Sequence, residues 1–169
     1  MKYFNGFALQ GEERFFESYL IKSDFCVAGF SYGAQLAFEY AYKTNKRIDR
    51  LLLLSPAFFQ HHKSSFMRTQ LRYFKSDQQA YTQQFLKNVA YPSSIDLKPY
   101  LNIGRYEELK SLLTYIWDKD KMMALQKRGV TIEVFIGGKD KIVDAQKSFE
   151  FFSKINTAYY FKEQGHLLI

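Results

Sequence analysis

Four consecutive leucines, Leu51–Leu54, constrain the fold of this chain more than any other segment. The side chains of a strand alternate between the two faces of a sheet, so an unbroken apolar run indicates a strand buried on both faces. Such strands occur in parallel sheets that carry other chain segments on each side. The run belongs to a predicted strand over 48–54, which Ser55 and Pro56 end. We therefore expect an α/β protein.

Both ends of the chain alternate between strand and helix patterns. The elements predicted there are further strands over 2–5, 24–28, 130–136 and 157–161, with helices over 12–21, 33–43 and 144–152. This alternation is typical of a mostly parallel sheet, here of about five strands. With 169 residues, the chain is expected to form a single domain over 1–169.

The middle of the chain, residues 56–129, has no strand pattern. Its four helical segments are predicted over 63–75, 77–90, 104–118 and 119–128, with Asp77 as the N-cap of the second. This insert follows the third strand at its carboxyl end, the edge at which parallel sheets bind ligands. We therefore expect 56–129 to form a four-helix lid above a site.

A Gly-x-Ser-x-Gly pentapeptide, Gly29–Gly33, lies between a predicted strand and a predicted helix. In a nucleophile elbow, the strand turns sharply into the helix and presents the serine on a strained turn. The glycines allow this turn without a clash of β-carbons. Ser31 is therefore the candidate nucleophile, and the helix N-terminus behind it favours negative charge that develops nearby.

A serine nucleophile needs a general base, and the chain has three histidines. His166 follows the last predicted strand, so it is expected at the same sheet edge as the elbow. His61 and His62 fall in the helical insert, where a surface loop explains them better. We predict His166 as the base.

A carboxylate that follows an intervening strand would orient this base, in the chain order Ser, Asp, His. Asp140 lies in a tight turn after the strand over 130–136, whereas Asp144 begins the next helix and suits an N-cap. We favour Asp140 over Asp144 as the partner of His166, whose tautomer it would set.

An oxyanion hole needs two backbone N–H donors. One is expected from Tyr32, the residue after the nucleophile, and the other from Phe7 in the loop after the first strand. Gly6 would allow the close approach of that loop, although a glycine that merely ends a strand fits the sequence nearly as well.

Three motifs in this order, Gly29–Gly33, Gly137–Asp140 and Gly165-His166, resemble the α/β-hydrolase superfamily. Within it the chain is most similar to the short esterases of biotin synthesis, of the BioV type, which remove the methyl ester from pimeloyl-acyl carrier protein methyl ester. The segments that carry this closer resemblance are Phe4–Phe7, Gly29–Ala34, Glu39–Tyr42 and Leu51–Pro56. The resemblance implies Ser31, Asp140 and His166 as catalytic residues and a carrier protein as substrate.

The chain also departs from the usual superfamily pattern. It has five predicted strands where a typical member has eight, and Asn5-Gly6 where the oxyanion loop usually has His-Gly. Only three residues follow His166, where a typical member has a final helix. One face of the sheet is therefore expected to be thinly covered. We predict that a homodimer buries this face or that it forms an exposed aromatic patch.

The formal net charge of +7 is unevenly distributed. Residues 56–129 contain 12 Lys or Arg and 6 Asp or Glu, whereas the remainder is nearly balanced, with 12 and 11. Arg68, Arg72 and Lys75 share one face of the first insert helix. They either form a solvated face or dock an acidic carrier protein. Nucleic acid is the other acidic partner, but no binding motif supports it.

These observations predict a serine carboxylesterase that hydrolyses the methyl ester of pimeloyl-acyl carrier protein and uses neither a metal nor a cofactor. A general small-ester esterase and an acyl thioesterase are alternatives on the same scaffold. A degenerate hydrolase that only binds ligands is an alternative of another class. No apolar run reaches 18 residues and no signal-peptide core is evident, so we expect a cytoplasmic protein without a membrane interaction.

Overall fold

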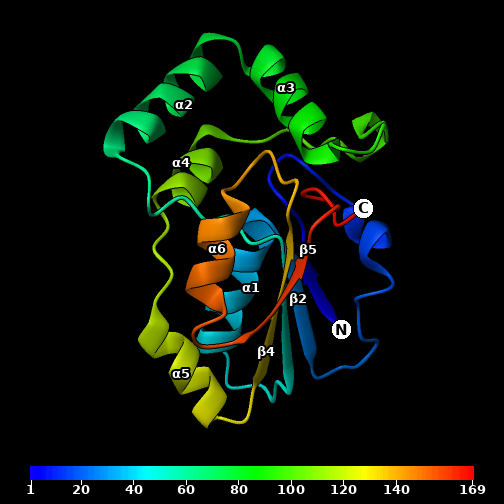
Figure 1. Cartoon of the computed structure of the whole chain (residues 1–169), viewed down its shortest axis with the longest axis vertical. Helices are drawn as coiled ribbons and strands as arrows, with labels where there is room; N and C mark the ends of the chain where they lie inside the picture. The colour runs from blue at the N-terminus through cyan, green and yellow to red at the C-terminus, as the bar shows by residue number, and fades with distance from the viewer.

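The computed structural model describes all 169 residues, and five parallel strands form its centre. The strands lie side by side in the order in which they occur in the chain. They are β1 (Lys2–Phe4), β2 (Cys26–Phe30), β3 (Arg50–Leu54), β4 (Thr131–Gly137) and β5 (Thr157–Phe161). The expected α/β fold with five parallel strands is confirmed (Figure 1).

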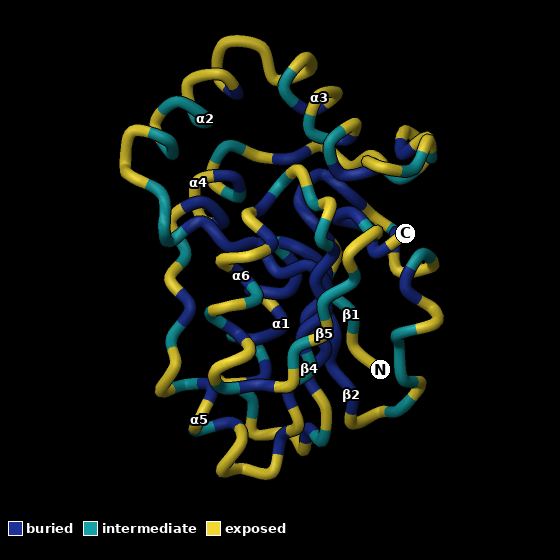
Figure 2. The backbone as a smooth tube through the Cα atoms, in the orientation of Figure 1, coloured by how far each residue is buried: buried dark blue, intermediate teal, exposed yellow.

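The leucine run explains why the sheet has two covered faces. Leu51 and Leu53 point into one apolar core, Leu52 and Leu54 point into the other, and all four are fully buried. The central strands are the most deeply buried part of the chain (Figure 2). A single strand thus contributes to both cores, as an unbroken apolar run requires.

Three helices cover the first face: α1 (Tyr32–Lys43), α5 (Lys119–Lys127) and α6 (Ala145–Phe152). In α1, the small residues Ala34, Ala37 and Ala41 are fully buried, which brings the helix axis close to the sheet. Figure 1 shows α5 beside α1, at the end of the sheet remote from the other insert helices.

The opposite face is covered by less regular chain. A short 3-10 helix, η1 (Glu12–Phe16), and the segment that follows it pack there with the C-terminal Leu167 and Leu168. The helix expected over 12–21 is therefore only one turn of 3-10 helix. The expectation of a thinly covered face is wrong over most of its area, because Tyr159 is the one exposed large apolar side chain of the strands. The homodimer stays a prediction.

The insert contains four helices, but only three of them lie over the carboxyl edge of the sheet (Figure 1). We call these three the cap: α2 (Ser64–Ser76), α3 (Gln78–Ala90) and α4 (Tyr106–Thr114), with a 3-10 turn, η2 (Lys98–Tyr100), between the last two. As expected, the Asp77 side chain caps α3 by accepting the Ala80 N–H at 2.9 Å.

The expected fourth lid helix, α5, belongs to the body of the fold. Met122 and Leu125 on α5 are fully buried in the core beneath the sheet. The Lys121 ammonium lies 2.8 Å from the Glu39 carboxylate on α1. An amphipathic helix must bury its apolar face, and for α5 the nearest apolar surface is the sheet. Without α5 and its flanking residues, the remaining part of the insert, residues 56–114, contains eight Lys or Arg and four Asp or Glu.

Candidate active site

Ser31 lies at the sharp turn between β2 and α1. Its backbone has φ 55° and ψ −113°, a conformation that costs energy for a residue with a side chain. Three backbone hydrogen bonds hold it: its N–H donates to Leu54 at 2.9 Å, and its carbonyl accepts from Ala34 and Ala57 at 3.1 Å. The surrounding structure thus fixes the strained turn and the direction of the serine side chain.

The two flanking glycines are required by close backbone contacts. A Cβ on Gly29 would lie 2.1 Å from the Gly33 carbonyl oxygen, and a Cβ on Gly33 would lie 2.0 Å from the Phe4 carbonyl oxygen. Neither position accepts any side chain without movement of the backbone. The pentapeptide therefore packs the start of α1 directly against the end of β1.

His166 and Asp140 come together with Ser31 at the carboxyl edge of the sheet. His166 Nε2 lies 2.9 Å from Ser31 Oγ, and His166 Nδ1 lies 2.5 Å from Asp140 Oδ2. The side chains of His166 and Asp140 are fully buried. The order of groups is that of a nucleophile, a base and an orienting carboxylate.

Asp140 is itself held by its neighbours. Its second oxygen, Oδ1, accepts the N–H groups of Ile142 at 2.6 Å and of Val143 at 3.1 Å. Asp144, the alternative candidate, caps α6 by accepting the Lys147 N–H at 3.0 Å. The structure therefore places Asp140, and not Asp144, against the histidine.

The loop that carries His166 is anchored by tight packing. A Cβ on Gly165 would lie 1.7 Å from the Tyr91 carbonyl oxygen, just after α3. The Gly165 N–H donates to the Ile169 carbonyl, and Leu168 donates back to Gly165. The cap and the last residues of the chain thus jointly set the position of the His166 ring. This contact is not predictable from the sequence, because nothing in the pattern links residue 91 with residue 165.

The other two histidines, His61 and His62, lie just before α2 and make no hydrogen bond with Ser31. Their ring centroids lie 4.0 Å apart with the rings tilted by 40°, and His62 stacks on Phe66 at 4.0 Å. Desolvation, and repulsion from nearby positive charge, lower the pKa of both imidazoles. His62 lines the cavity described next, so it is not the simple surface residue that we expected.

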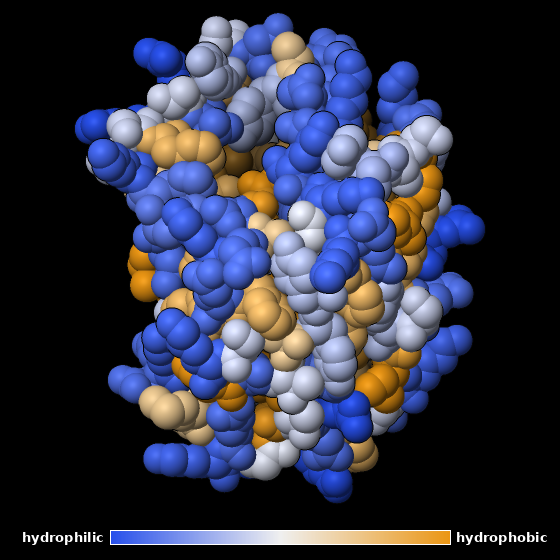
Figure 3. Space-filling model, in the orientation of Figure 1, coloured by the Kyte–Doolittle hydropathy of each residue, from blue (hydrophilic) through white to orange (hydrophobic).

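A cavity of about 450 Å³ lies between Ser31 and the cap. Its apolar walls come from the loop after β1, from the start of the cap and from α3 and α4, and they include Phe7, Phe59, Phe66, Phe85, Leu109, Leu112 and Leu113. Its polar walls come mostly from α2 and α3, as Gln70, Tyr73, Tyr81, Gln84 and Asn88. Figure 3 shows apolar side chains in a recess between the cap and the body, below a largely hydrophilic outer surface. The amides were not predicted from the sequence, because helix patterns do not reveal which polar residues face a cavity.

The two predicted oxyanion donors have no other partner. The Phe7 N–H and the Tyr32 N–H make no hydrogen bond within the chain. Tyr32 begins α1, where the first backbone N–H groups have no partner inside the helix. Phe7 and Ser31 both line the cavity. Ser31 therefore has two neighbouring backbone N–H groups, those of Phe7 and Tyr32, that are available to bind an oxyanion.

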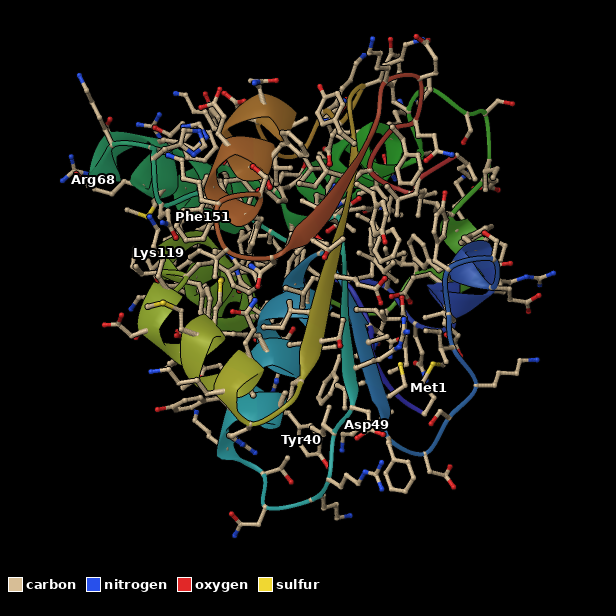
Figure 4. All side chains as sticks on the ribbon, turned by 60° about the horizontal axis from the view of Figure 1, so that its bottom comes forward. Met1, Tyr40, Asp49, Arg68, Lys119 and Phe151 are labelled. Atoms are coloured by element: carbon tan, nitrogen blue, oxygen red, sulfur yellow. The ribbon has the colours of Figure 1, made fainter.

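The predicted docking residues Arg68, Arg72 and Lys75 are exposed on the outer face of α2 and form no ion pair. Figure 4 shows Arg68 pointing away from the body of the molecule. On the opposite face of α2, Phe74 is buried and packs into the cap core with Met67 and Leu71. The helix is thus apolar inward and basic outward.

Known structures share this fold. An esterase from Exiguobacterium antarcticum matches with a TM-score of 0.64 at 16% identity, over 83% of this chain and 59% of that one. The carboxylesterase CesB from Bacillus subtilis matches with a TM-score of 0.56 at 18% identity, over 85% and 53%. This chain thus spans little more than half the length of those esterases.

A third match covers nearly the whole of both chains. BioG from Haemophilus influenzae has a TM-score of 0.61 at 10% identity, over 98% of this chain and 87% of BioG. No protein-family model and no curated protein matches the sequence. These similarities, together with the sheet order and the turn at Ser31, show that the chain has the α/β-hydrolase fold.

No helix of this structure combines the length and the apolar character needed to cross a bilayer.

Proposed function

We propose that this protein is a serine carboxylesterase that removes the methyl ester from pimeloyl-acyl carrier protein methyl ester. The observation that carries the proposal is the hydrogen-bonded series of Ser31, His166 and Asp140 at the base of a cavity. Esterases among the structures with the same fold agree with this reaction class.

In the acylation step, Ser31 Oγ attacks the ester carbonyl carbon while His166 Nε2 takes the hydroxyl proton. Asp140 stabilises the imidazolium that forms. The tetrahedral intermediate then collapses, and the bond from carbon to the methoxy oxygen breaks. His166 gives its proton to that oxygen, so methanol leaves and an acyl-serine remains.

In the deacylation step, a water molecule donates a proton to His166 Nε2 and adds to the acyl carbon. The bond to Ser31 Oγ breaks, and the oxygen regains its proton from His166. The product is a free carboxylic acid. In both steps the N–H groups of Phe7 and Tyr32 would hold the oxyanion, and the chain and water supply every proton that moves.

The shape and charge around the site support an acyl chain on an acidic carrier. The apolar walls beside Ser31 suit a hydrocarbon chain. The unpaired cations on the outside of the cap suit an acidic protein surface, which they would attract over a distance. A carrier docked there could pass its flexible arm into the cavity, so that the ester at the far end reaches Ser31 while the thioester stays outside.

The proposal is tested by incubating the protein with pimeloyl-acyl carrier protein methyl ester and weighing the product by mass spectrometry. We expect loss of one methyl group with the acyl chain still attached to its carrier. Release of the acyl chain would indicate the alternative, an acyl thioesterase. Rapid cleavage of small chromogenic esters without the carrier reaction would indicate a general esterase. Failure of Ser31 to react with a fluorophosphonate would indicate a binding module.

Charge reversal on the cap tests the carrier contact. We expect Arg68→Glu with Arg72→Glu to lower kcat/KM on the carrier-bound ester by about 10-fold or more, because steering contacts mainly affect association. The wild-type reaction should also slow with added salt, and the variant reaction much less.

The matched substrate is a small chromogenic ester, on which the variant should keep its activity. Lys127→Glu with Lys154→Glu, two exposed cations outside the cap, is the matched variant and should retain the carrier reaction. Equal losses on both substrates would show a disturbed cap and contradict the docking assignment.

A further inference from the structure

A buried carboxyl group lies outside the proposed Ser-His-Asp series and has no role in it. Glu12, in η1, is fully buried. Its Oε1 accepts the Gly6 N–H at 2.7 Å and the Tyr3 hydroxyl at 3.3 Å, while its Oε2 has no partner. Burying a carboxyl group with so few partners costs free energy, so its retention calls for an explanation.

The Gly6 contact acts on the loop that carries a proposed oxyanion donor. The Gly6 carbonyl accepts the Leu9 N–H at 3.3 Å, and the Gly6 N–H is held by Glu12. Because a trans peptide is planar, its C=O and N–H groups point in opposite directions. The Phe7 N–H belongs to the same peptide as the Gly6 carbonyl, so fixing Gly6 on both sides fixes the direction of the Phe7 N–H.

Other contacts hold the same loop but do not involve the peptide between Gly6 and Phe7. The Asn5 side chain accepts the Gly11 N–H at 3.3 Å, which closes the loop at its ends. Phe16, on the same 3-10 turn as Glu12, packs on Phe30 at 4.8 Å, and Phe30 in turn lies 4.9 Å from the His166 ring. One short turn therefore connects the oxyanion loop with the base of the reaction.

We propose that Glu12 is a positioning residue that aims the Phe7 N–H at the oxyanion through its hydrogen bond to Gly6. The inference rests on the proposed esterase function.

Burial also affects the charge of the Glu12 carboxyl group. Desolvation raises the pKa of the carboxyl group, which favours its neutral form. Oε1 can accept the Gly6 N–H in either protonation state, so the contact does not depend on the charge of the group. Glutamine, which has the same shape and a carbonyl oxygen, should therefore replace it.

Three substitutions test the inference. Glu12→Leu keeps the volume but removes the acceptor, and we expect kcat to fall about 100-fold with KM changed less than twofold, as for loss of one oxyanion donor. Glu12→Gln should keep kcat within about fivefold, because it keeps the acceptor. Glu12→Asp is one methylene shorter and should fall between the two, and it supports the test if the leucine variant does not fold.

A readout independent of turnover is amide hydrogen exchange at Gly6, measured by NMR. Exchange should be fast in the leucine variant and slow in the wild type and in Glu12→Gln. As a stability control, Leu125→Ala lies in the core on the other face of the sheet. It should lower Tm without a change in kcat.

Normal kcat in Glu12→Leu with fast Gly6 exchange would overturn the inference, as would a Glu12→Gln variant as slow as Glu12→Leu. Neither result would affect the proposed function, since Ser31→Ala would still be inactive. Full activity of Ser31→Ala would instead reject the esterase mechanism, whatever the Glu12 variants do.

Discussion

Replacing Ser31 with alanine is expected to lower kcat on an ester substrate by about 10⁶-fold. The substitution removes the oxygen that forms the acyl-enzyme, and no other hydroxyl lies at 2.9 Å from His166 Nε2. The residual rate should come from binding and from the backbone donors alone. Initial rates with a chromogenic ester at saturating substrate concentration measure this loss in kcat.

The fold should be unaffected by this change. Serine and alanine both have a Cβ, so the strain at φ 55° is the same in each, and the three hydrogen bonds that hold the turn are made by the backbone of residue 31. We expect an unchanged circular dichroism spectrum and a Tm within a few degrees of the wild type. The variant should also fail to react with a fluorophosphonate. Labelling of the alanine variant, or activity within 100-fold of the wild type, would contradict the mechanism.

The second large effect is expected for Asp140→Asn, a change of one atom. We expect kcat to fall about 10⁴-fold while the geometry stays the same. The side-chain oxygen of asparagine must accept the N–H groups of Ile142 and Val143, which contact Oδ1 in the wild type. Its NH₂ group then faces His166 Nδ1, which has to act as an acceptor. The imidazole proton moves to Nε2, the atom that should take the proton of Ser31.

A neighbouring aspartate is the matched control for this experiment. Asp144→Asn changes the same charge four residues further on, but asparagine is an equally good N-cap for α6. We expect its kcat to stay within about twofold. A large loss in Asp144→Asn with little loss in Asp140→Asn would reverse the assignment of the carboxylate.

The sequence identified the parts of the fold that depend on local pattern. The leucine run predicted a strand with two buried faces, and the pattern over 33–43 predicted a helix, which packs closely on the sheet through Ala34, Ala37 and Ala41. Both follow from side-chain periodicity, which is a property of the backbone and needs no knowledge of distant residues. The Gly-x-Ser-x-Gly turn is equally local, because its glycines are required by contacts within the turn itself and with the adjacent strand.

The hydrophobic periodicity did not predict which segments pack against each apolar face. Helix α5 has the amphipathic character of a lid helix, yet its buried residues pack beneath the sheet. The segment after β1 was predicted as a helix and forms only one 3-10 turn, because its aromatic residues spread over the second face of the sheet instead of lining one stripe. Periodicity indicates that a face is buried but does not indicate what covers it.

The sequence by itself thus determined the sheet, the turn that carries Ser31 and the candidate partners of that serine. Only the tertiary structure decided that Asp140 contacts His166 while Asp144 caps a helix, since both carboxylates follow the same strand. It also decided that Glu12 lies beneath the oxyanion loop and that the cap end packs on Gly165. The physical reason is the same in each case. Hydrogen bonds and close contacts between segments far apart in the chain form or fail on differences of a few tenths of an ångström in the distance between their atoms. Local periodicity contains no information on those distances.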